Sequence, residues 1–176
     1  NIKLCYINEV KECMQDLIIS FKKEREWRAR VDIIKSLIFL AERGEHIFND
    51  SFKEIAYLLL EDEVYTVRKE AGFLFKKLIK LYGVDFYKDD DKKLLSLISH
   101  IKYQYRIAAI SVVIEILNNT EDIRYLYLLD ELSSDIVLGV RFALLHEIRE
   151  SFINKKFKNE IINIIVAMSI TSCDQL

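Results

Sequence analysis

The chain has 176 residues, 51% of them hydrophobic, and its 26 basic and 28 acidic side chains give a formal net charge of −2. The length and hydrophobic content are sufficient for a continuous core, and the nearly balanced charge gives no support to a nucleic-acid-binding or anionic-membrane surface. With no proline and only four glycines, the composition favours an all-helical chain.

The cysteines and the apolar runs bear on the cellular compartment. The three cysteines are scattered, which favours reduced thiols over a disulfide framework. No apolar run approaches the roughly 20 residues that a membrane-spanning helix needs. We therefore expect a cytoplasmic or nuclear protein.

Apolar residues at helical spacing predict short helices that alternate between an outer and an inner layer. Residues 2–10 are interpreted as the end of an inner helix. The outer helices are then expected at residues 12–21, from Asn49 or Asp50 onward, at 92–99, at 123–132 and at 157–168. The inner helices are expected at residues 27–42, 63–82, 103–117 and 137–152.

Glycines and polar residues mark the ends of these helices. Gly44 and Gly83 follow inner helices, where C-terminal glycines are common. The acidic run at residues 89–91 is interpreted as a surface linker before the third helix pair. Thr120 and Asn154 are expected to introduce the outer helices that follow them.

One sequence pattern recurs four times, each time where an outer helix gives way to an inner one. An arginine lies near the start of each inner helix, with steps of 38, 38 and 35 residues: Arg30, Arg68, Arg106 and Arg141. A period near 40 residues is typical of solenoids built from stacked antiparallel helix pairs. We expect an all-α solenoid that runs through residues 1–176 as a single segment. Its incomplete repeats at both ends indicate a piece of a longer array.

Each of these arginines follows a polar residue by six positions: Glu24, Asp62, His100 and Asp135. The arginine is expected to pair with this residue across the turn. Pairs stacked from repeat to repeat would form a ladder that fixes the rotation of one helix pair on the next. Because His100 replaces a carboxylate, the ladder is expected to be weakest there. On this basis, loss of Arg106 should cost less stability than loss of Arg68.

A large apolar side chain lies three positions before each arginine, at the edge of the turn: Trp27, Tyr65, Tyr103 and Leu138. Such a row along one edge of a solenoid is typical of the anchors of a protein interface. The alternative is that each side chain packs against its own helix pair. Under the first interpretation, Trp27→Ala should leave the melting temperature nearly unchanged and weaken binding of a partner, to which Arg28 would also reach.

The sequence gives no sign of catalysis. His46, His100 and His146 are too far apart in sequence to form a recognisable metal-binding motif. There is no glycine-rich phosphate loop or nucleophile elbow, and no two carboxylates stand out as an acid–base pair. We expect a protein that is not an enzyme and that carries no cofactor or metal.

Several stretches resemble the HEAT repeats of one family, the scaffold (A) subunits of protein phosphatase 2A. The sequence WRARVDII at residues 27–34 is similar to the eleventh repeat of that family, and VYTVRKEA at residues 64–71 is similar to the next. VRF at residues 140–142 resembles the fourteenth repeat, and INEV at residues 7–10 resembles the end of the tenth.

This resemblance extends over residues 5–168 and implies a non-catalytic scaffold. In that family, the carboxyl-terminal repeats hold the phosphatase catalytic subunit through their intra-repeat turns, and regulatory B-type subunits bind earlier repeats, outside this segment. Carried over by position, the residues that would contact the catalytic subunit are Trp27, Arg28, Tyr65, Tyr103, Tyr105, Val137 and Leu138. The chain departs from the family in lacking prolines and in having His100 where the family has an acidic residue.

Two alternatives stay open at this point. One is a HEAT scaffold of another complex, such as a transport or chromosome-organising factor, in which the turns bind a different protein. The other is a HEAT-like DNA-processing enzyme, which would need a basic concave face and a catalytic carboxylate. The balanced charge argues against the second, so neither nucleic acid nor a membrane is expected as a partner.

Overall fold

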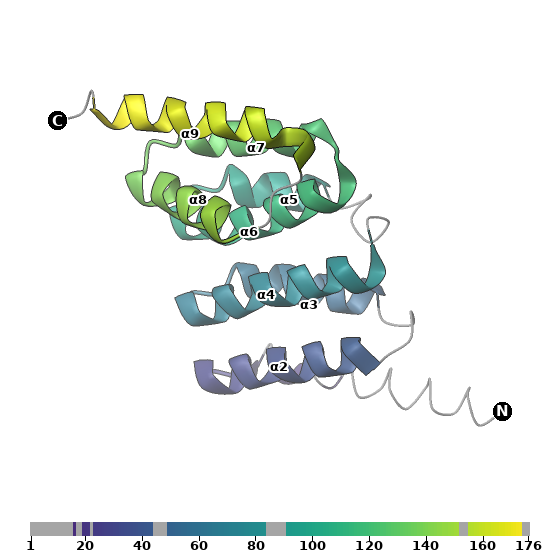
Figure 1. The fold of residues 1–176 in the computed structure, drawn as a ribbon. Helices are drawn as coiled ribbons and strands as arrows, with labels where there is room; N and C mark the ends of the chain where they lie inside the picture. The colour runs from purple at the N-terminus through teal and green to yellow at the C-terminus, as the bar shows by residue number, and fades with distance from the viewer. Residues whose placement is uncertain are drawn as a thin grey trace. The chain divides into compact units, whose positions relative to one another are not determined.

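The structure, a computed structural model, describes residues 16, 19–21, 23–43, 49–83, 91–151 and 155–173. In these residues the chain forms nine helices and no strand, which confirms the all-α class (Figure 1). Four parts of the expected organisation lie outside the described residues. They are the helix at residues 2–10, Gly44, the first two residues of the acidic run at 89–91, and Asn154. The chain divides into two compact units, Asn1–Phe86 and Tyr87–Leu176.

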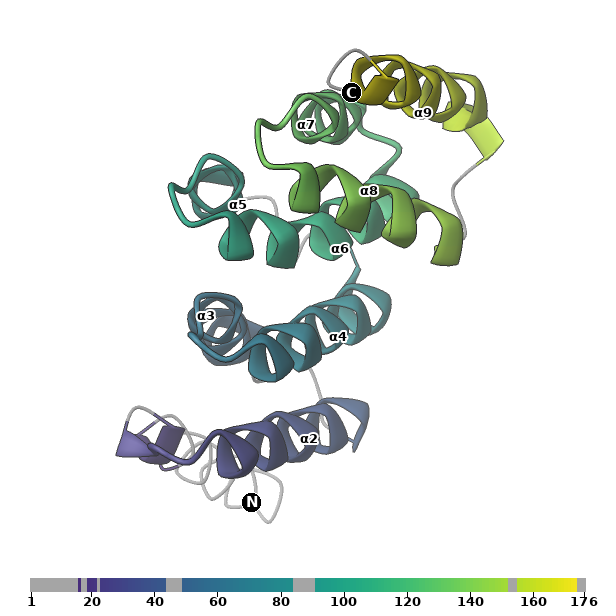
Figure 2. The same cartoon turned by 90° about the vertical axis from the view of Figure 1, so that its left-hand side faces the viewer.

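The first unit contains three long described helices. These are α2 (Trp27–Arg43), α3 (Asn49–Leu60) and α4 (Tyr65–Tyr82). A short turn joins α3 to α4 as a helical hairpin, and α2 packs along α4 (Figure 2). Helix α4 begins two residues later than expected because Val64 is still extended, with φ −87° and ψ 123°.

The core of the first unit consists of apolar side chains that recur at helical spacing. The completely buried ones include Ile34, Leu37, Ile55, Leu59, Leu74, Phe75 and Leu78. Tyr57 of α3 packs edge-on against Phe75 of α4, with ring centroids 4.8 Å apart. Burial of each large side chain contributes about 1.5–3 kcal/mol, and this contribution holds α2 and the α3–α4 hairpin together.

The second unit contains two hairpins and a further helix. The first hairpin is α5 (Asp91–Ile98) with α6 (Tyr103–Thr120), and the second is α7 (Ile123–Ser133) with α8 (Leu138–Glu150). They are followed by a 3-10 turn, η3 (Lys155–Phe157), and by α9 (Lys158–Cys173). Helix α6 packs against α8, and α7 packs against α9 (Figure 2).

The start of α7 differs from the expectation that Thr120 caps it. Helix α6 continues through Thr120, and Glu121 then takes a left-handed conformation with φ 52°. Asp122 is the N-cap, and its carboxylate accepts a hydrogen bond from the Arg124 N–H at 2.9 Å. Thr120 has a secondary part, since its hydroxyl accepts the Asp122 N–H at 3.1 Å.

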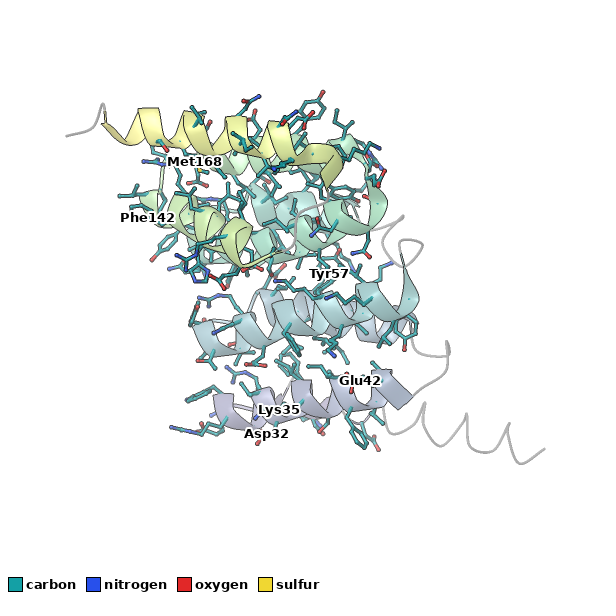
Figure 3. The ribbon with its side chains drawn as sticks, in the orientation of Figure 1. Asp32, Lys35, Glu42, Tyr57, Phe142 and Met168 are labelled. Atoms are coloured by element: carbon teal, nitrogen blue, oxygen red, sulfur yellow. The ribbon has the colours of Figure 1, made fainter. Side chains whose placement is uncertain are left out.

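The second unit also buries apolar side chains from each of its long helices, among them Leu94, Val113, Leu129, Leu144 and Ile161. Met168 of α9 is buried, whereas Phe142 of α8 lies on the surface (Figure 3).

None of the helices in the described part of the chain combines the length and apolarity that a bilayer crossing requires.

Gly83 provides a test of the end of α4. It has φ 73° and ψ −169°, a combination that is essentially restricted to glycine. Among the described residues, and apart from Gly83 and its chain neighbours, no heavy atom lies within 4 Å of the position that a Cβ would take. Gly83→Ala should therefore lower the free energy of unfolding through backbone strain alone, by about 1–3 kcal/mol in urea denaturation.

Gly139, in the first turn of α8, is the matched control. A Cβ there would make only an ordinary contact, with Val137 Cγ1 at 3.9 Å. Because alanine is the better helix former, Gly139→Ala should raise the free energy of unfolding by about 0.5 kcal/mol. Similar losses at both glycines would show that the strain argument for Gly83 is wrong.

Candidate protein-binding surface at the helix turns

The four turns identified in the sequence share one capping hydrogen bond. In each, the side chain six positions before the arginine accepts the backbone N–H two positions after itself. The acceptors are Glu24 Oε1 (from Glu26, 2.7 Å), Asp62 Oδ1 (from Val64, 2.8 Å), His100 Nδ1 (from Lys102, 2.9 Å) and Asp135 Oδ1 (from Val137, 2.8 Å). His100 is therefore a functional substitute for a carboxylate in this bond.

The arginines bind the backbone of their own turns. Their Nη1 groups donate to the carbonyl oxygens six or five positions earlier: Arg30 to Glu24 and Arg25, Arg68 to Asp62 and Glu63, Arg106 to His100 and Ile101, and Arg141 to Asp135. The pairing expected from the sequence was with the side chain at this position. The structure places the carbonyl oxygen of that residue within reach of the arginine instead.

Two of the arginines bind, in addition, a carboxylate of the following hairpin. Arg30 binds Asp62 with Nε–Oδ2 at 2.7 Å and Nη2–Oδ1 at 2.9 Å. Arg106 binds Asp135 with Nε–Oδ2 at 2.6 Å and Nη2–Oδ1 at 2.9 Å. These side chains are only 7–13% exposed. Bidentate geometry and burial make such pairs stronger than ion pairs on the open surface.

This geometry changes the expected order of importance of the arginines. Arg106 was expected to matter less than Arg68 because His100 lies six positions before it. Its carboxylate partner is Asp135, 29 positions later in the sequence. The presence of His100 therefore gives no reason to rank Arg106 below Arg68.

The hydrogen bonds also affect the ionisation of the aspartates. Burial alone would raise the pKa of Asp135, but hydrogen bonds from Arg106 and the Val137 amide, with the nearby arginine charges, hold this pKa below its ordinary value. The side-chain and backbone hydrogen bonds of Arg124 similarly lower the pKa of Asp122.

The residues expected to contact a partner lie in different environments. Tyr65 is 62% exposed, and Tyr103 and Leu138 are also exposed. Each of these three is the first residue of its helix. Their turns therefore present them to solvent.

The other four residues expected to contact a partner are Trp27, Arg28, Val137 and Tyr105. Trp27 is half-buried, and the exposed Arg28 guanidinium lies 4.5 Å from the centroid of its ring. Val137 is half-buried as the N-cap of α8. Tyr105 is buried, with its ring centroid 4.7 Å from that of His100. Because Trp27 is partly covered, Trp27→Ala is a less clean test of binding than a change at Tyr65.

Sequence reasoning missed two of the most exposed side chains. Ile101 and Ile136 are each 91% exposed, and both lie five positions before an arginine. The available signal was a large aliphatic residue within a polar turn, at the same place in two repeats. The capping hydrogen bond directs the side chain of His100 or Asp135 toward the backbone, and the isoleucine that follows is left in solvent.

The ion pairs bring these turns together within each unit. The Arg106–Asp135 pair joins the α5–α6 turn to the α7–α8 turn. We call the four exposed apolar side chains of these two turns the turn edge of the second unit: Ile101, Tyr103, Ile136 and Leu138. The Arg30–Asp62 pair in the same way joins the turns of Trp27 and Tyr65 in the first unit.

No known family model matches the chain, and no curated protein sequence is significantly similar to it. Among the described residues, no group of three or more histidine, cysteine, aspartate or glutamate side chains is placed to hold a metal ion.

The ion pair between the two hairpins of the second unit is testable by mutation. Arg106→Ala leaves the Asp135 carboxylate nearly buried without its bidentate partner, and it should lower the free energy of unfolding by about 2–4 kcal/mol. A double-mutant cycle with Asp135→Ala should give a coupling energy of about 1 kcal/mol or more. Losses that simply add would contradict the pairing.

The control for Arg106 is Arg124, whose side chain is 67% exposed and pairs with Asp122 at 2.7 Å. Since exposed pairs contribute little, Arg124→Ala should cost less than about 1 kcal/mol.

The lowered pKa of Asp135 predicts how stability responds to acid. The folded chain favours the carboxylate form, so its contribution to stability is complete above about pH 4, the ordinary aspartate range. The contribution is lost as the pH falls through the folded-state pKa. Asp135→Asn keeps an acceptor but cannot ionise, so it should lose less stability than the wild type between about pH 5 and about pH 2.5.

Asp130→Asn, at an exposed position of α7, is the control for this titration. It should keep the wild-type dependence of urea midpoint on pH. If Asp135→Asn also keeps that dependence, the ion pair is not what holds the carboxylate charged.

Proposed function

We propose that the chain is a segment of a HEAT-repeat solenoid and acts as a non-catalytic scaffold whose turns bind the catalytic subunit of protein phosphatase 2A. The hairpins of each unit support the first part, because they repeat the same turn with the same arginine. A repeat of this kind builds an extended surface from equivalent positions.

The main support for a binding role is the combination of fixed turns with exposed apolar side chains. Each turn is closed by its capping bond and by an arginine that binds its carbonyl groups. The turn edge of the second unit nevertheless exposes two isoleucines, a tyrosine and a leucine. A turn whose backbone is already fixed loses little backbone entropy on binding, and exposed large apolar side chains on such a turn are typical of interface anchors.

The choice of partner comes from the resemblance to the phosphatase scaffold. The stretches that carry it, residues 27–34 and 64–71, contain the turn residues Trp27, Arg28 and Tyr65. In the second unit, Tyr103, Val137 and Leu138 lie at the corresponding positions, and we add Ile101 and Ile136 to them. In this proposal the chain contributes no catalytic group, needs no cofactor, and acts in the cytoplasm or nucleus with the phosphatase.

Tyr65 and Tyr127 form a matched pair for testing the proposal. Tyr65 follows the α3–α4 turn as the first residue of α4 and is 62% exposed, whereas Tyr127 lies on the surface of α7 and is 64% exposed. Loss of an anchor ring should cost about 2 kcal/mol of binding, or about thirtyfold in affinity. We expect Tyr65→Ala to weaken binding to the purified phosphatase catalytic subunit by this factor and Tyr127→Ala to leave it unchanged, as measured by isothermal titration calorimetry.

Both substitutions remove exposed rings, so both variants should melt at the wild-type temperature. Equal affinities for the two variants would rule out the turns as the binding surface. If the wild-type chain itself fails to bind the catalytic subunit, the choice of partner is wrong. Proteins captured from a native extract, and lost with Tyr65→Ala but not with Tyr127→Ala, would then identify the complex that the scaffold serves.

A further inference from the structure

Arg68 lacks the carboxylate that two of its counterparts bind. In Arg30 and Arg106, the guanidinium edge formed by Nε and Nη2 holds both oxygens of an aspartate at 2.6–2.9 Å. Arg68 binds the carbonyl oxygens of its own turn through Nη1, as they do. Among the residues that the structure describes, however, no carboxylate pairs with Arg68, and its Nε and Nη2 donate to no acceptor.

The sequence explains the difference. Asp62 follows Arg30 by 32 positions, and the residue 32 positions after Arg68 is His100. An imidazole has no pair of oxygens to match the planar fork of a guanidinium. The Nδ1 atom of His100 accepts the Lys102 N–H of its own turn.

The acidic residues closest to Arg68 in the sequence leave its edge unfilled. Both carboxylate oxygens of Asp62 are bound by the arginine of α2. Glu61 and Glu63 are exposed, and Glu70 is half-buried on α4. Their side chains form no ion pair with Arg68, so the edge has no acid from its own turn or helix.

An unfilled edge is costly for a side chain in this position. Arg68 is only 7% exposed, so its charge is largely removed from water. An anion that satisfies the remaining donors stabilises such a guanidinium. Nε and Nη2 nevertheless keep some contact with solvent, so an acceptor from outside can reach them.

An exposed aromatic ring lies on the same side of α4. Tyr65 precedes Arg68 by three positions, a spacing that makes two side chains neighbours on a helix surface. The Tyr65 side chain is 62% exposed. A protein that covers this ring is therefore placed to bring an acidic side chain to the edge of Arg68. Tyrosine and arginine are also enriched among the anchors of protein interfaces.

We propose that the Nε–Nη2 edge of Arg68 is a binding site for a carboxylate, which an aspartate or glutamate side chain of a partner protein supplies. The carboxylate takes the place that Asp62 has on Arg30 and that Asp135 has on Arg106, with one oxygen on Nε and the other on Nη2. The site follows from the arginine and its turn. It does not depend on whether the partner is the phosphatase catalytic subunit.

The arginine Nε–Hε signals of the isotopically labelled, full-length chain test the site by NMR. The probe is N-acetylaspartate N-methylamide, which carries a single carboxylate and is added at constant ionic strength. The Arg68 signal should shift saturably, whereas the signals of Arg30 and Arg106, whose edges are occupied, should not move. The asparagine analogue should bind about tenfold more weakly, because it lacks the charge and one acceptor oxygen.

Two kinds of variant serve as controls for this titration. Asp135→Ala empties the same edge of Arg106, so the Arg106 signal should then respond to the probe. Asp62→Ala does the same for Arg30 if the first variant does not fold. Arg68→Lys keeps the positive charge but has no planar fork, and the backbone amide signals at the start of α4 should no longer shift.

A capped Leu-Asp-Leu peptide distinguishes a protein partner from a free small carboxylate. Its leucines give it an apolar contact beside the acid, so it should bind about fivefold more tightly than the aspartate probe. Tyr65→Ala should remove this gain and leave the affinity for the aspartate probe unchanged. If the peptide gains nothing from its leucines, a partner protein is the wrong source of the carboxylate.

The wild-type titration decides whether the site exists. An Arg68 signal that does not respond to the aspartate probe would overturn the proposal, whatever the variants do. Equal shifts with the aspartate and asparagine probes would overturn it as well, because the edge would then not select a carboxylate. A saturable shift that is confined to Arg68 and is stronger with aspartate would support it.

Discussion

Within each unit, the packing of the helices depends on a guanidinium group that binds on two sides. One side of Arg30 or Arg106 binds the carbonyl oxygens of its own turn, and the other binds a carboxylate of the next hairpin. A guanidinium has five N–H donors in a fixed plane, so it can satisfy both sets of acceptors at once. Local turn structure and the packing of one hairpin on another are thus fixed by the same side chain.

The capping bond of each turn also explains which residues stand at the N-caps of the inner helices. The N-cap residues Val64, Lys102 and Val137 form no side-chain cap. Capping is moved upstream, to the acceptor six positions before the arginine. The N-cap position therefore needs no capping side chain, so valine or lysine can occupy it, directly before the exposed tyrosine or leucine that begins the helix.

The sequence was sufficient for the helices and for the repeat, because both follow from local spacing. The ranges expected for α2 and α5 agree with the structure to within one residue. The partner of each arginine was not predictable in this way. It depends on how far one hairpin is displaced along the next, which only tertiary packing determines. His100 was compared with aspartate by charge, and that comparison did not predict that its ring nitrogen closes the turn by accepting a hydrogen bond.

Exposure was also only partly predictable. Trp27 and Tyr65 occupy the same place in the repeat, yet Trp27 is half-buried beneath Arg28 and Tyr65 is largely in solvent. Ile101 and Ile136 were overlooked because aliphatic residues are usually assigned to the core. The capped turn directs them outward regardless of their hydrophobicity.

The dual use of Asp62 and Asp135 restricts how this sequence can change over time. Each carboxylate closes its own turn and also holds an arginine 32 or 29 positions earlier. A substitution at the aspartate therefore damages two neighbouring hairpins, and one at the arginine leaves a nearly buried negative charge. Either first step is costly, so residues 30 and 62, and residues 106 and 135, are expected to be inherited as coupled pairs. At His100 the turn is closed by a ring nitrogen rather than by a carboxylate. Either side chain can accept the hydrogen bond, so this position is expected to tolerate exchange among residues that supply such an acceptor.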